Sequence, residues 1–461
     1  MSEENILKSR VGKTPLIRAK KLEEELGISK IYLKLEGGNP SGHREDRLAY
    51  LIIKDALDFG KDTICFGSFY GLGNSLAYLC QYYDINLVFV LPKKSKATKK
   101  AVLNQPNIKI IEHGKNITES VEHSNKLAEE NNWYNANPGV ENNVLNMSAL
   151  SYIASELSTQ AKEPITSVFS QMSYGFSVSG LHLGFRQLWI HDQIKKMPQL
   201  YSCTTDTGNI ILQTYQEGSD KIDLKGQEKI KTSRYNRHLV NLNSSVAQDA
   251  LNAIYDTNGK MMGVSDEELV EYVSMFKKLE KIKLNTANGF PIAGFIKQAK
   301  EGKIDDGVHV ILLNDGKANV EIDSVTKEEK DISNDKVVGL INDWLMEFTD
   351  PKEEIYEALD NALDKGHLLF AYHNKDLAGI AIIVGTGFEH FSAKYHLAYI
   401  ATKRTIKGRG IATQLLTKAV EVTDGNLSLH VEKNNKKAIK LYEKMGFDAP
   451  YTRMLHKAKG K

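Results

Sequence analysis

The 461-residue sequence predicts an α/β protein with two domains. Over the first three hundred residues, short apolar runs alternate with amphipathic helical patterns, which is typical of a mostly parallel sheet covered on both faces. The stretch Ala318–Lys336 is polar and charge-rich, and beyond it two helical patterns precede a run of strands. Because a chain of this length exceeds one ordinary core, we place the domains at residues 1–318 and 319–461.

Charge, cysteine content and apolar runs indicate which classes of protein this chain can belong to. The 60 basic and 58 acidic residues leave a net charge of +2, which gives no electrostatic basis for binding nucleic acid or an anionic membrane. Cys65, Cys80 and Cys203 form no Cys-x-x-Cys motif and indicate reduced, buried thiols. No apolar run reaches 18 residues and the acidic N-terminus lacks an apolar leader, so we expect a soluble cytoplasmic protein. We expect no metal site.

Strands of the first domain are expected where apolar runs are short and bounded by turn residues. They are predicted at Ile31–Leu35, Thr63–Phe66, Leu87–Leu91, Ile108–Ile111, Ser167–Phe169 and Val308–Leu313. In sheets of this kind, ligands bind in the crevice outside the carboxyl ends of the strands. The loops that follow these runs are therefore where functional residues are expected.

The second domain begins after a stretch in which Val320–Asp323 fits either a linker or a first strand. Asp350 is predicted as an N-cap and Pro351 as the first residue of a helix. Helices are predicted at Val337–Phe348 and Glu353–Lys365, and strands at His367–His373, Leu377–Val384 and Tyr395–Thr402. A strand, a helix and a last strand complete the domain between Leu427 and Leu455.

A glycine-rich turn, Lys407–Ala412, follows the strand that ends at Thr402 and opens a helical pattern. Such a turn directs successive backbone N–H groups toward one point, where the helix dipole also favours negative charge. The pattern therefore predicts a turn that binds a diphosphate. A second amphipathic segment, Asn435–Phe447, follows a short strand at Leu427–Val431 and contains a glycine suited to end the helix.

Together these segments resemble the GNAT superfamily of acyl-CoA N-acyltransferases. The signature Arg/Gln-x-x-Gly-x-Gly/Ala is carried by Lys407, Gly410 and Ala412, with Lys407 departing from it in place of Arg or Gln. A later Asn-x-x-Ala-x-x-Leu-Tyr begins at Asn435 and ends at Tyr442. The resemblance implies an α+β domain that binds acetyl-CoA. The residues implied to bind it are Ile400, Thr402, Lys407, Gly408, Arg409, Gly410, Ile411, Ala412, Thr413 and Asn435.

Acyl transfer to an amine needs a base for the amine and an acid for the leaving thiolate. The resemblance implies that Tyr442 protonates the CoA sulfur, while a tyrosine in this helix also suits a core position. For the base we expect Glu389. His390, His396 and a chain of waters are the alternatives.

The first domain carries a second resemblance. Gly12–Arg18 and Ile31–Arg47 resemble the opening of threonine synthase and cysteine synthase, fold-type II pyridoxal-phosphate enzymes with two parallel-sheet lobes. Where that family writes Asn-Pro-Thr-Gly-Ser-Phe-Lys-Asp-Arg, Glu45 takes the place of the Schiff-base lysine, and a carboxylate cannot form an imine. Further degenerate positions of that site are Ser68 and Gly71 in one loop, and Ser173 and Gly175 in the phosphate loop.

Pyridoxal phosphate is therefore not expected, and the role of the first domain stays open. One interpretation is a scaffold for folding or oligomerisation. Its pocket would be filled by Phe69, Tyr70, Tyr174 and Phe176. Another is a remodelled pocket in which His43, Arg44 and Glu45 hold a small polar molecule such as an amino acid. Two further interpretations are a solvated charged turn at Glu45 and Asp46, and a new acid/base pair of His43 and Glu45.

We predict an acyl-CoA-dependent N-acetyltransferase that acts on a small amine or amino acid, with a first domain that no longer performs Schiff-base chemistry. Acceptor selectivity is expected in Val337–Lys365 and Gly385–Lys394, and the resemblance implies a homodimer. One alternative is a working pyridoxal-phosphate lyase or synthase, against which Glu45 argues. The other is a non-catalytic ligand sensor, against which the intact motif Lys407–Thr413 argues.

Overall fold

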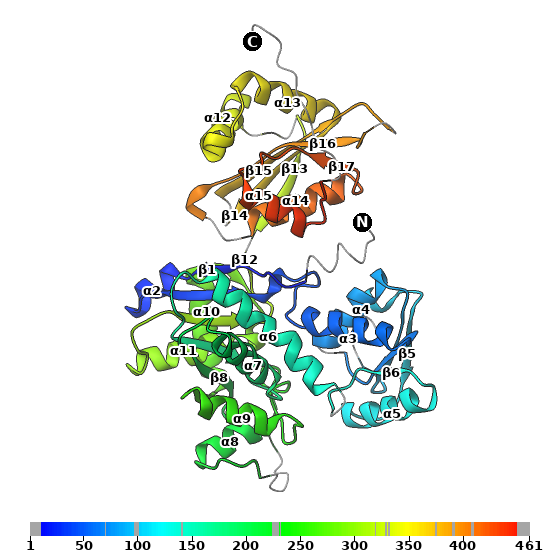
Figure 1. Ribbon diagram of the computed structural model, residues 1–461, viewed down its shortest axis with the longest axis vertical. Helices are drawn as coiled ribbons and strands as arrows, with labels where there is room; N and C mark the ends of the chain where they lie inside the picture. Colours follow the sequence, from blue (N-terminus) through cyan, green and yellow to red (C-terminus); the bar gives the residue numbers. More distant parts are fainter. Residues whose placement is uncertain are drawn as a thin grey trace. The chain divides into compact units, whose positions relative to one another are not determined.

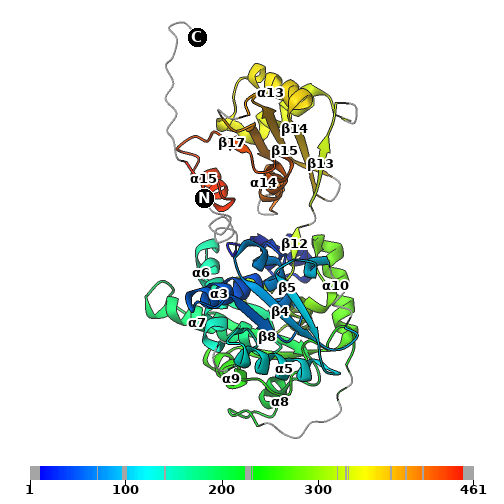
Figure 2. The same ribbon diagram turned by 90° about the vertical axis from the view of Figure 1, so that its right-hand side faces the viewer.

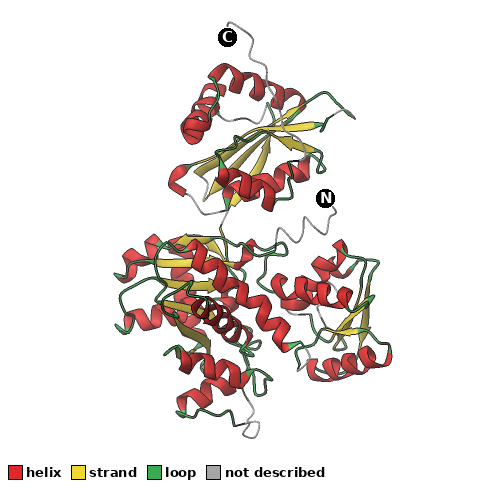
Figure 3. Cartoon of the chain, viewed as in Figure 1, coloured by secondary structure: helices red, strands yellow, loops and turns green. Residues whose placement is uncertain are grey.

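The computed structural model describes most of the chain, namely residues 11–69, 71–95, 101–139, 142–223, 230, 232–318, 320–327, 330, 332–373, 376–389, 392–406 and 410–449. The chain divides into two compact units, a first unit of Val11–Asn319 and a second unit that begins at Val320. Each unit has its own sheet structure and core (Figures 1 and 3).

The larger sheet of the first unit has six strands in the order β1-β2-β11-β7-β8-β9. Every neighbouring pair is parallel except β1 with β2. The central strands β7 and β11 are buried along their whole length, as expected where helices cover both faces. The strands are β1 (Leu16–Arg18), β2 (Ile31–Leu35), β11 (His309–Leu313), β7 (Ser167–Gln171), β8 (Gln199–Thr205) and β9 (Lys260–Val264).

A smaller parallel sheet, β5-β4-β3-β6, forms the second lobe of the first unit (Figure 1). The predicted α/β class with two parallel-sheet lobes is therefore confirmed. The strands are β5 (Ile108–Glu112), β4 (Asn86–Leu91), β3 (Thr63–Phe66) and β6 (Tyr134–Asn135). The α-helices of the unit are α2 (Lys20–Leu26), α3 (Asp46–Asp58), α4 (Gly71–Leu79), α5 (Ile117–Glu130), α6 (Asn143–Gln160), α7 (Phe176–Ile190), α8 (Ile210–Gln216), α9 (Ala247–Asp256), α10 (Asp266–Glu280) and α11 (Phe290–Lys300).

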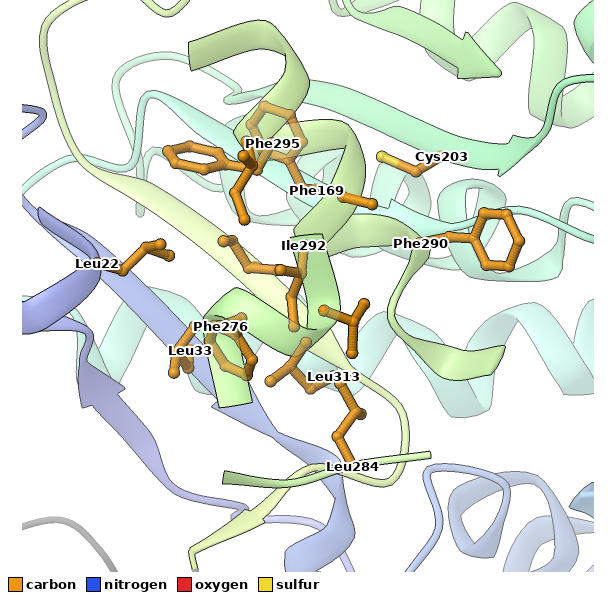
Figure 4. Close-up of a cluster of buried hydrophobic side chains, with 14 of the residues drawn as sticks. Leu22, Leu33, Phe169, Cys203, Phe276, Leu284, Phe290, Ile292, Phe295 and Leu313 are labelled. Carbon is orange, nitrogen blue, oxygen red and sulfur yellow. The ribbon is translucent and has the colours of Figure 1, made fainter. Parts of the chain in front are cut away.

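Helix α11 lies in the core of the larger lobe (Figure 4). Its Phe295 ring meets Phe169 of β7 edge-on with centroids 5.0 Å apart, and Phe169 stacks on Tyr201 of β8 at 4.4 Å. Burial of one such side chain stabilises the fold by roughly 1.5–3 kcal/mol. The core therefore joins the helix to the central strands, whose carboxyl ends it holds in fixed positions.

The second unit has a five-stranded sheet in sequence order, β13-β14-β15-β16-β17 (Figure 2). The pairs are antiparallel except β16 with β17, which is parallel. Helices α12 (Asn334–Leu345) and α13 (Lys352–Lys365) cover one face, and α14 (Ile411–Val422) and α15 (Lys436–Lys444) lie on the other (Figure 1). The strands are β13 (Val320–Val325), β14 (His367–His373), β15 (Asp376–Gly385), β16 (Tyr395–Thr402) and β17 (Leu427–Leu429).

Both faces of this sheet pack closely. Ile341 of α12 and Leu359 of α13 belong to one buried cluster with Ile382 of β15. On the opposite face, α14 approaches β15 so closely that a Cβ on Gly379 would lie 2.7 Å from the Cδ1 atom of Leu415. The first face is called the α12/α13 face below.

Some predicted details were wrong or lie outside the described residues. Helix α13 begins at Lys352 with Pro351 as its N-cap, and Asp350 instead accepts a hydrogen bond from the hydroxyl of Tyr399 at 2.9 Å. Val320–Asp323 belongs to strand β13, not to a linker. The last strand, predicted to run to Leu455, lies mostly beyond Ala449, where the described residues end.

In the described part of the chain, no helix is long and apolar enough to cross a membrane. No group of three or more His, Cys, Asp and Glu side chains there could hold a metal ion. The three cysteines are buried and unbridged.

Candidate functional site

Strands β16 and β17, the last two in the order of the second unit's sheet, diverge along their length. They pair only over Tyr395–Leu397 and Leu427–Leu429. On its other edge, β16 pairs with β15 so that Leu397 lies opposite Ile383 and Tyr399 opposite Ile382, which leaves Ala398 as an extra, bulged residue. A bulge bends a strand and increases its twist. Beyond it, among the described residues, β16 pairs with β15 alone, so one edge of Ala398–Thr402 is open to an extended ligand.

The open edge leads to the N-terminus of α14. The chain passes from β16 through a 3₁₀ turn at Arg404–Ile406 to Gly410, which precedes α14 with a φ of 75°, in the left-handed region that favours glycine. The first backbone N–H groups of the helix, from Ile411 to Thr413, have no carbonyl acceptor within the helix, because no helical turn precedes them. They also lie at the positive end of the helix dipole. They suit an anion such as a diphosphate. Lys407, Gly408 and Arg409 lie outside the described residues.

Helix α15 contributes the predicted acid. Tyr442 is 9 % exposed, its ring meets Phe447 edge-on at 6.1 Å, and burial raises its pKa to about 12. The phenol therefore carries its proton at neutral pH, as a proton donor must. Asn435, predicted to contact acetyl-CoA, caps the helix: its Oδ1 accepts a hydrogen bond from the Ala438 N–H at 3.1 Å.

The predicted bases lie in different surroundings. Glu389 is exposed in the loop after β15, and His390 lies outside the described residues. His396 is on β16, where its Nδ1 lies 2.9 Å from the hydroxyl of Ser428 on β17. The ring of His430, which follows β17, lies 4.4 Å from that of His396. The sequence analysis missed His430, although its position two residues after Ser428 places it on the same face of an extended segment.

In the first unit, Arg44 and Glu45 lie in the loop that joins β2 to α3. They form an ion pair at 2.7 Å, and Arg44 also donates a hydrogen bond to Ser177 in the first turn of α7. The carboxyl group of Glu45 lies against the first residue of α4, since a Cβ on Gly71 would be 3.0 Å from its Cδ atom. The two side chains thus lie at the N-termini of two helices.

Polar groups gather around this pair at the carboxyl ends of β7 and β11; we call Arg44, Glu45, Gln171, His238, Asn314 and Asp315 the carboxyl-end cluster. The Arg44 N–H donates to the Asn314 carbonyl at 2.8 Å, and Gln171 Nε2 lies 2.9 Å from His238 Nε2. Burial lowers the pKa of His238 and raises that of Asp315. Four buried polar atoms of the cluster have no hydrogen-bond partner among the described residues: Arg44 Nε, Gln171 Oε1, Asn314 Oδ1 and Asp315 Oδ1.

Two other positions predicted for this pocket, Gly175 and Ser173, contribute to packing and to backbone hydrogen bonds. Gly175 precedes α7 with a φ of 107°, and a Cβ there would lie 2.7 Å from the Cβ of Ala250. The carbonyl of Ser173 accepts hydrogen bonds from Asn209 and Asn241 at 3.0 and 3.1 Å. Ser68 lies in the loop before α4.

The aromatic residues expected in this pocket lie in different surroundings. Tyr174 is 45 % exposed, which contradicts the expectation that it fills the site. Phe69 is buried, but it packs on Phe89 of β4 with centroids 5.4 Å apart. Phe176 packs against a buried cluster of the larger lobe. Tyr70 lies outside the described residues.

A buried ionic network supports the same loop. Arg47 pairs with Glu36 and Glu156, each at 2.7 Å, and the fully buried Lys34 pairs with Glu156 at 2.6 Å. Burial pushes the pKa of Glu156 upward, but the hydrogen bonds and charges of Arg47 and Lys34 outweigh it and hold the pKa at about 2. The sequence analysis missed this network, whose members lie up to 122 residues apart.

Comparisons with known proteins match two different families to two separate parts of the chain. Residues 7–315 match the model of the pyridoxal-phosphate dependent enzyme family, and residues 337–447 match that of the acetyltransferase (GNAT) family. Threonine synthase of Methanocaldococcus jannaschii is 28 % identical over 317 residues, which cover 68 % of this chain and 76 % of the relative. Cysteine synthase 1 of Emericella nidulans is 37 % identical over 99 residues, 21 % of this chain and 26 % of the relative.

Solved structures share the fold of the first unit. The L-serine ammonia-lyase of Rhizomucor miehei superimposes with a TM-score of 0.55 at 21 % identity, covering 66 % of this chain and 93 % of that one. Threonine deaminase isoform 2 of Solanum lycopersicum gives the same score at 18 % identity. The chain therefore belongs to the pyridoxal-phosphate dependent enzyme family, and it carries in addition a C-terminal acetyltransferase domain of the GNAT family.

Proposed function

We propose that the chain is an acyl-CoA-dependent N-acetyltransferase that acts on a small amine or amino acid. The observation that carries the proposal is the divergence of β16 from β17 after the bulge at Ala398, directly before the N-terminus of α14. An open strand edge offers hydrogen bonds to an amide-containing chain, and a helix N-terminus attracts a diphosphate. Acetyl-CoA contains both groups.

In this arrangement, the N–H groups of Gly410 to Thr413 hold the diphosphate, and the charges of Lys407 and Arg409 favour its binding. The backbone of Ile400 and Thr402 pairs with the pantetheine arm and polarises the thioester carbonyl. Asn435 reaches the pantetheine with its amide nitrogen while its oxygen caps α15. The N–C bond forms as the C–S bond breaks, and Tyr442 gives its proton to the leaving sulfur.

The first unit does not suit pyridoxal phosphate. By resemblance Glu45 occupies the place of the lysine, and its carboxylate cannot form an imine. That carboxylate pairs with Arg44 and packs on Gly71, so it has a structural role in the loop between β2 and α3. Its negative charge opposes a phosphate-bearing cofactor. The first unit therefore takes no part in Schiff-base chemistry in this proposal.

A ligand-binding role for the first unit is supported by the unpartnered atoms of the carboxyl-end cluster. Leaving a buried polar group without a hydrogen bond costs about 1–3 kcal/mol, so four such atoms together favour a bound partner. One is a guanidinium donor and three are oxygen acceptors. A carboxylate for Arg44 Nε and an ammonium for the oxygens are the groups of a free amino acid. The alternative is a scaffold that only supports the second unit.

Calorimetric titration of the full chain tests the acetyltransferase assignment. We expect acetyl-CoA to bind and pyridoxal phosphate to give no heat. Thr413→Glu places a negative charge in the first turn of α14 and should raise the dissociation constant for acetyl-CoA at least tenfold. The matched control Thr417→Glu, one turn later on the exposed side of the same helix, should leave it unchanged. Equal effects of the two variants would contradict the binding site.

Turnover and absorbance separate the alternatives. Thiol release from acetyl-CoA in the presence of primary amines and the twenty amino acids should reveal an acceptor. Binding of acetyl-CoA without turnover of any acceptor would favour the ligand sensor. A yellow protein that borohydride traps after incubation with pyridoxal phosphate would favour the lyase or synthase instead. Heat from a titration with an amino acid, lost in Arg44→Gln, would support the carboxyl-end cluster as its site.

A further inference from the structure

We propose that His396 and His430 form the proton-accepting pair of the second unit, with His396 as the base and His430 as the group that passes the proton to solvent. The inference rests on the proposed acetyltransferase function and names a catalytic residue for it. It differs from the prediction of Glu389, which lies exposed in the loop between β15 and β16.

The strand register places His396 beside the open edge. It lies opposite Val384 of β15, and Val384, Ile382 and Ile380 alternate along that strand on the α12/α13 face. His396 is therefore on the α12/α13 face, two residues before the bulge at Ala398. Its other neighbour is Ser428 of β17, directly across the parallel pair. It thus lies where the two strands begin to separate, at the end of the segment that would hold the thioester.

Hydrogen bonds around Ser428 favour one tautomer of the His396 ring. The Ser428 hydroxyl is placed to donate to the Tyr395 carbonyl at 3.3 Å. With its hydrogen used there, its oxygen accepts from His396 Nδ1, which lies 2.9 Å away. In the arrangement we propose, the neutral ring is protonated at Nδ1, and Nε2 is the basic nitrogen. Ser428 acts as a positioning residue that selects this tautomer.

The second ring gives the proton a route outward. His430 follows β17, is exposed to solvent, and lies 4.4 Å from His396 with its ring tilted by 54°. His396 is only half exposed. A proton taken up by His396 can thus pass to an imidazole in contact with water, which regenerates the base for the next turnover.

Titratable groups on the α12/α13 face include phenolic, acidic and basic side chains. Tyr399 follows the bulge, and its hydroxyl donates a hydrogen bond to the Asp350 carboxylate. Burial raises the pKa of Tyr399, and the charges of Asp350 and Glu354 raise it further. β15 presents the apolar Val384 and β17 presents Ser428. At the end of α13, Lys365 and Asp364 are mostly exposed. The end of α13 approaches the strand beside His396, because a Cβ on Gly385, which pairs with Tyr395, would lie 2.5 Å from the Lys365 carbonyl oxygen.

The chemistry balances without a further reactant. The neutral amine attacks the thioester carbon, an N–C bond forms, and the proton of the resulting ammonium passes to His396 Nε2. The C–S bond breaks, and its electron pair leaves with sulfur, which receives a proton from Tyr442. Water returns a proton from the imidazolium pair to the tyrosine. The products are an N-acetylated amine and the free thiol.

Steady-state kinetics of the full chain test the pair, with the fastest acceptor from a panel of primary amines and the twenty amino acids. His396→Gln should lower kcat by about 10²–10⁴-fold and remove the rise of kcat/KM with pH that reports a neutral imidazole. The dissociation constant for acetyl-CoA should not change. His430→Gln should cause a smaller loss, and the control Asp364→Asn, at an exposed position of α13, should cause none. Unchanged turnover in His396→Gln, or an equal loss in Glu389→Gln, would overturn the proposal.

A second measurement does not depend on finding an acceptor. Nitrogen chemical shifts of ¹⁵N-labelled histidines should show neutral His396 protonated at Nδ1, and Ser428→Ala should shift the ring toward a mixture of tautomers. Acetyl-CoA should perturb the signals of both His396 and His430. A neutral ring protonated at Nε2 would overturn the assignment of the base. Failure to bind acetyl-CoA would instead refute the proposed function, so the two failures are distinguishable.

Discussion

Glu156→Gln should destabilise the first unit strongly at neutral pH. Glu156 is the shared partner of Arg47 and of the fully buried Lys34, so its removal leaves Lys34 without its paired carboxylate and Arg47 with Glu36 alone. Breaking a buried pair in this way costs about 3–5 kcal/mol in the free energy of unfolding. The exposed pair of Lys30 and Glu163, 2.5 Å apart, offers a matched control. Glu163→Gln should cost under about 1 kcal/mol, because water screens that pair.

The Glu156 carboxylate also makes the free energy of unfolding depend on pH. Its pKa falls from 4.5 to about 2 in the folded protein, which corresponds to about 3 kcal/mol. Because the folded pKa is depressed, this stability is present above pH 4.5 and is lost as the pH falls toward 2. The wild type should therefore lose it over that window, and Glu156→Gln should not.

Urea unfolding at pH 7, 5 and 3 measures both effects. Trp133 and Trp189 belong to the first unit and Trp344 to the second, so a Trp344→Phe background isolates the fluorescence of the first unit. A Lys34→Met, Glu156→Gln double variant should recover part of the loss, since it removes the uncompensated charge as well. If Glu156→Gln and Glu163→Gln lay within 1 kcal/mol of each other at pH 7, the network would not stabilise the fold as we infer.

Three further predictions concern single positions. Tyr442→Phe should lower kcat without changing the dissociation constant for acetyl-CoA, and an unchanged kcat would remove the phenol from the mechanism. Gly175→Ala should destabilise the first unit by about 1–3 kcal/mol in thermal unfolding, because φ is positive and the new Cβ would meet that of Ala250. Gly379→Val should destabilise the second unit by a similar amount and weaken acetyl-CoA binding, because it displaces α14; Gly339→Ala, where a Cβ meets nothing within 4 Å, is the control and should be neutral or slightly stabilising.

The apolar pattern predicted the strands of the second unit well. β14 and β16 begin and end at the expected residues, since apolar alternation bounded by turns marks them clearly. β8 was missed because its sequence, Gln-Leu-Tyr-Ser-Cys-Thr-Thr, contains four polar side chains and only three apolar ones, although Ser202 and Thr204 are fully buried in the sheet. Their burial depends on neighbouring strands that are distant in sequence, so local pattern cannot reveal it.

The sequence pattern identified strand β16 and helices α14 and α15, but not the geometry between strands. The bulge at Ala398 depends on how β16 pairs with β15, and no residue type marks it. His430 became a candidate only because its ring lies beside that of His396 on the neighbouring strand. Asp350 looked like a helix cap, yet the hydroxyl of Tyr399 binds it instead. Long-range pairing decided all three.

The order of strands in the larger sheet bears on synthesis at the ribosome. β11, the last long strand of the first unit, lies between β2 and β7, so that sheet cannot close until about residue 313 has left the exit tunnel. Until then β2 and β7 present unpaired edges, which are sites of aggregation for a nascent chain. The sheet of the second unit follows chain order and can assemble as each strand emerges. We therefore expect the first unit to depend more on chaperones than the second, although it is made first.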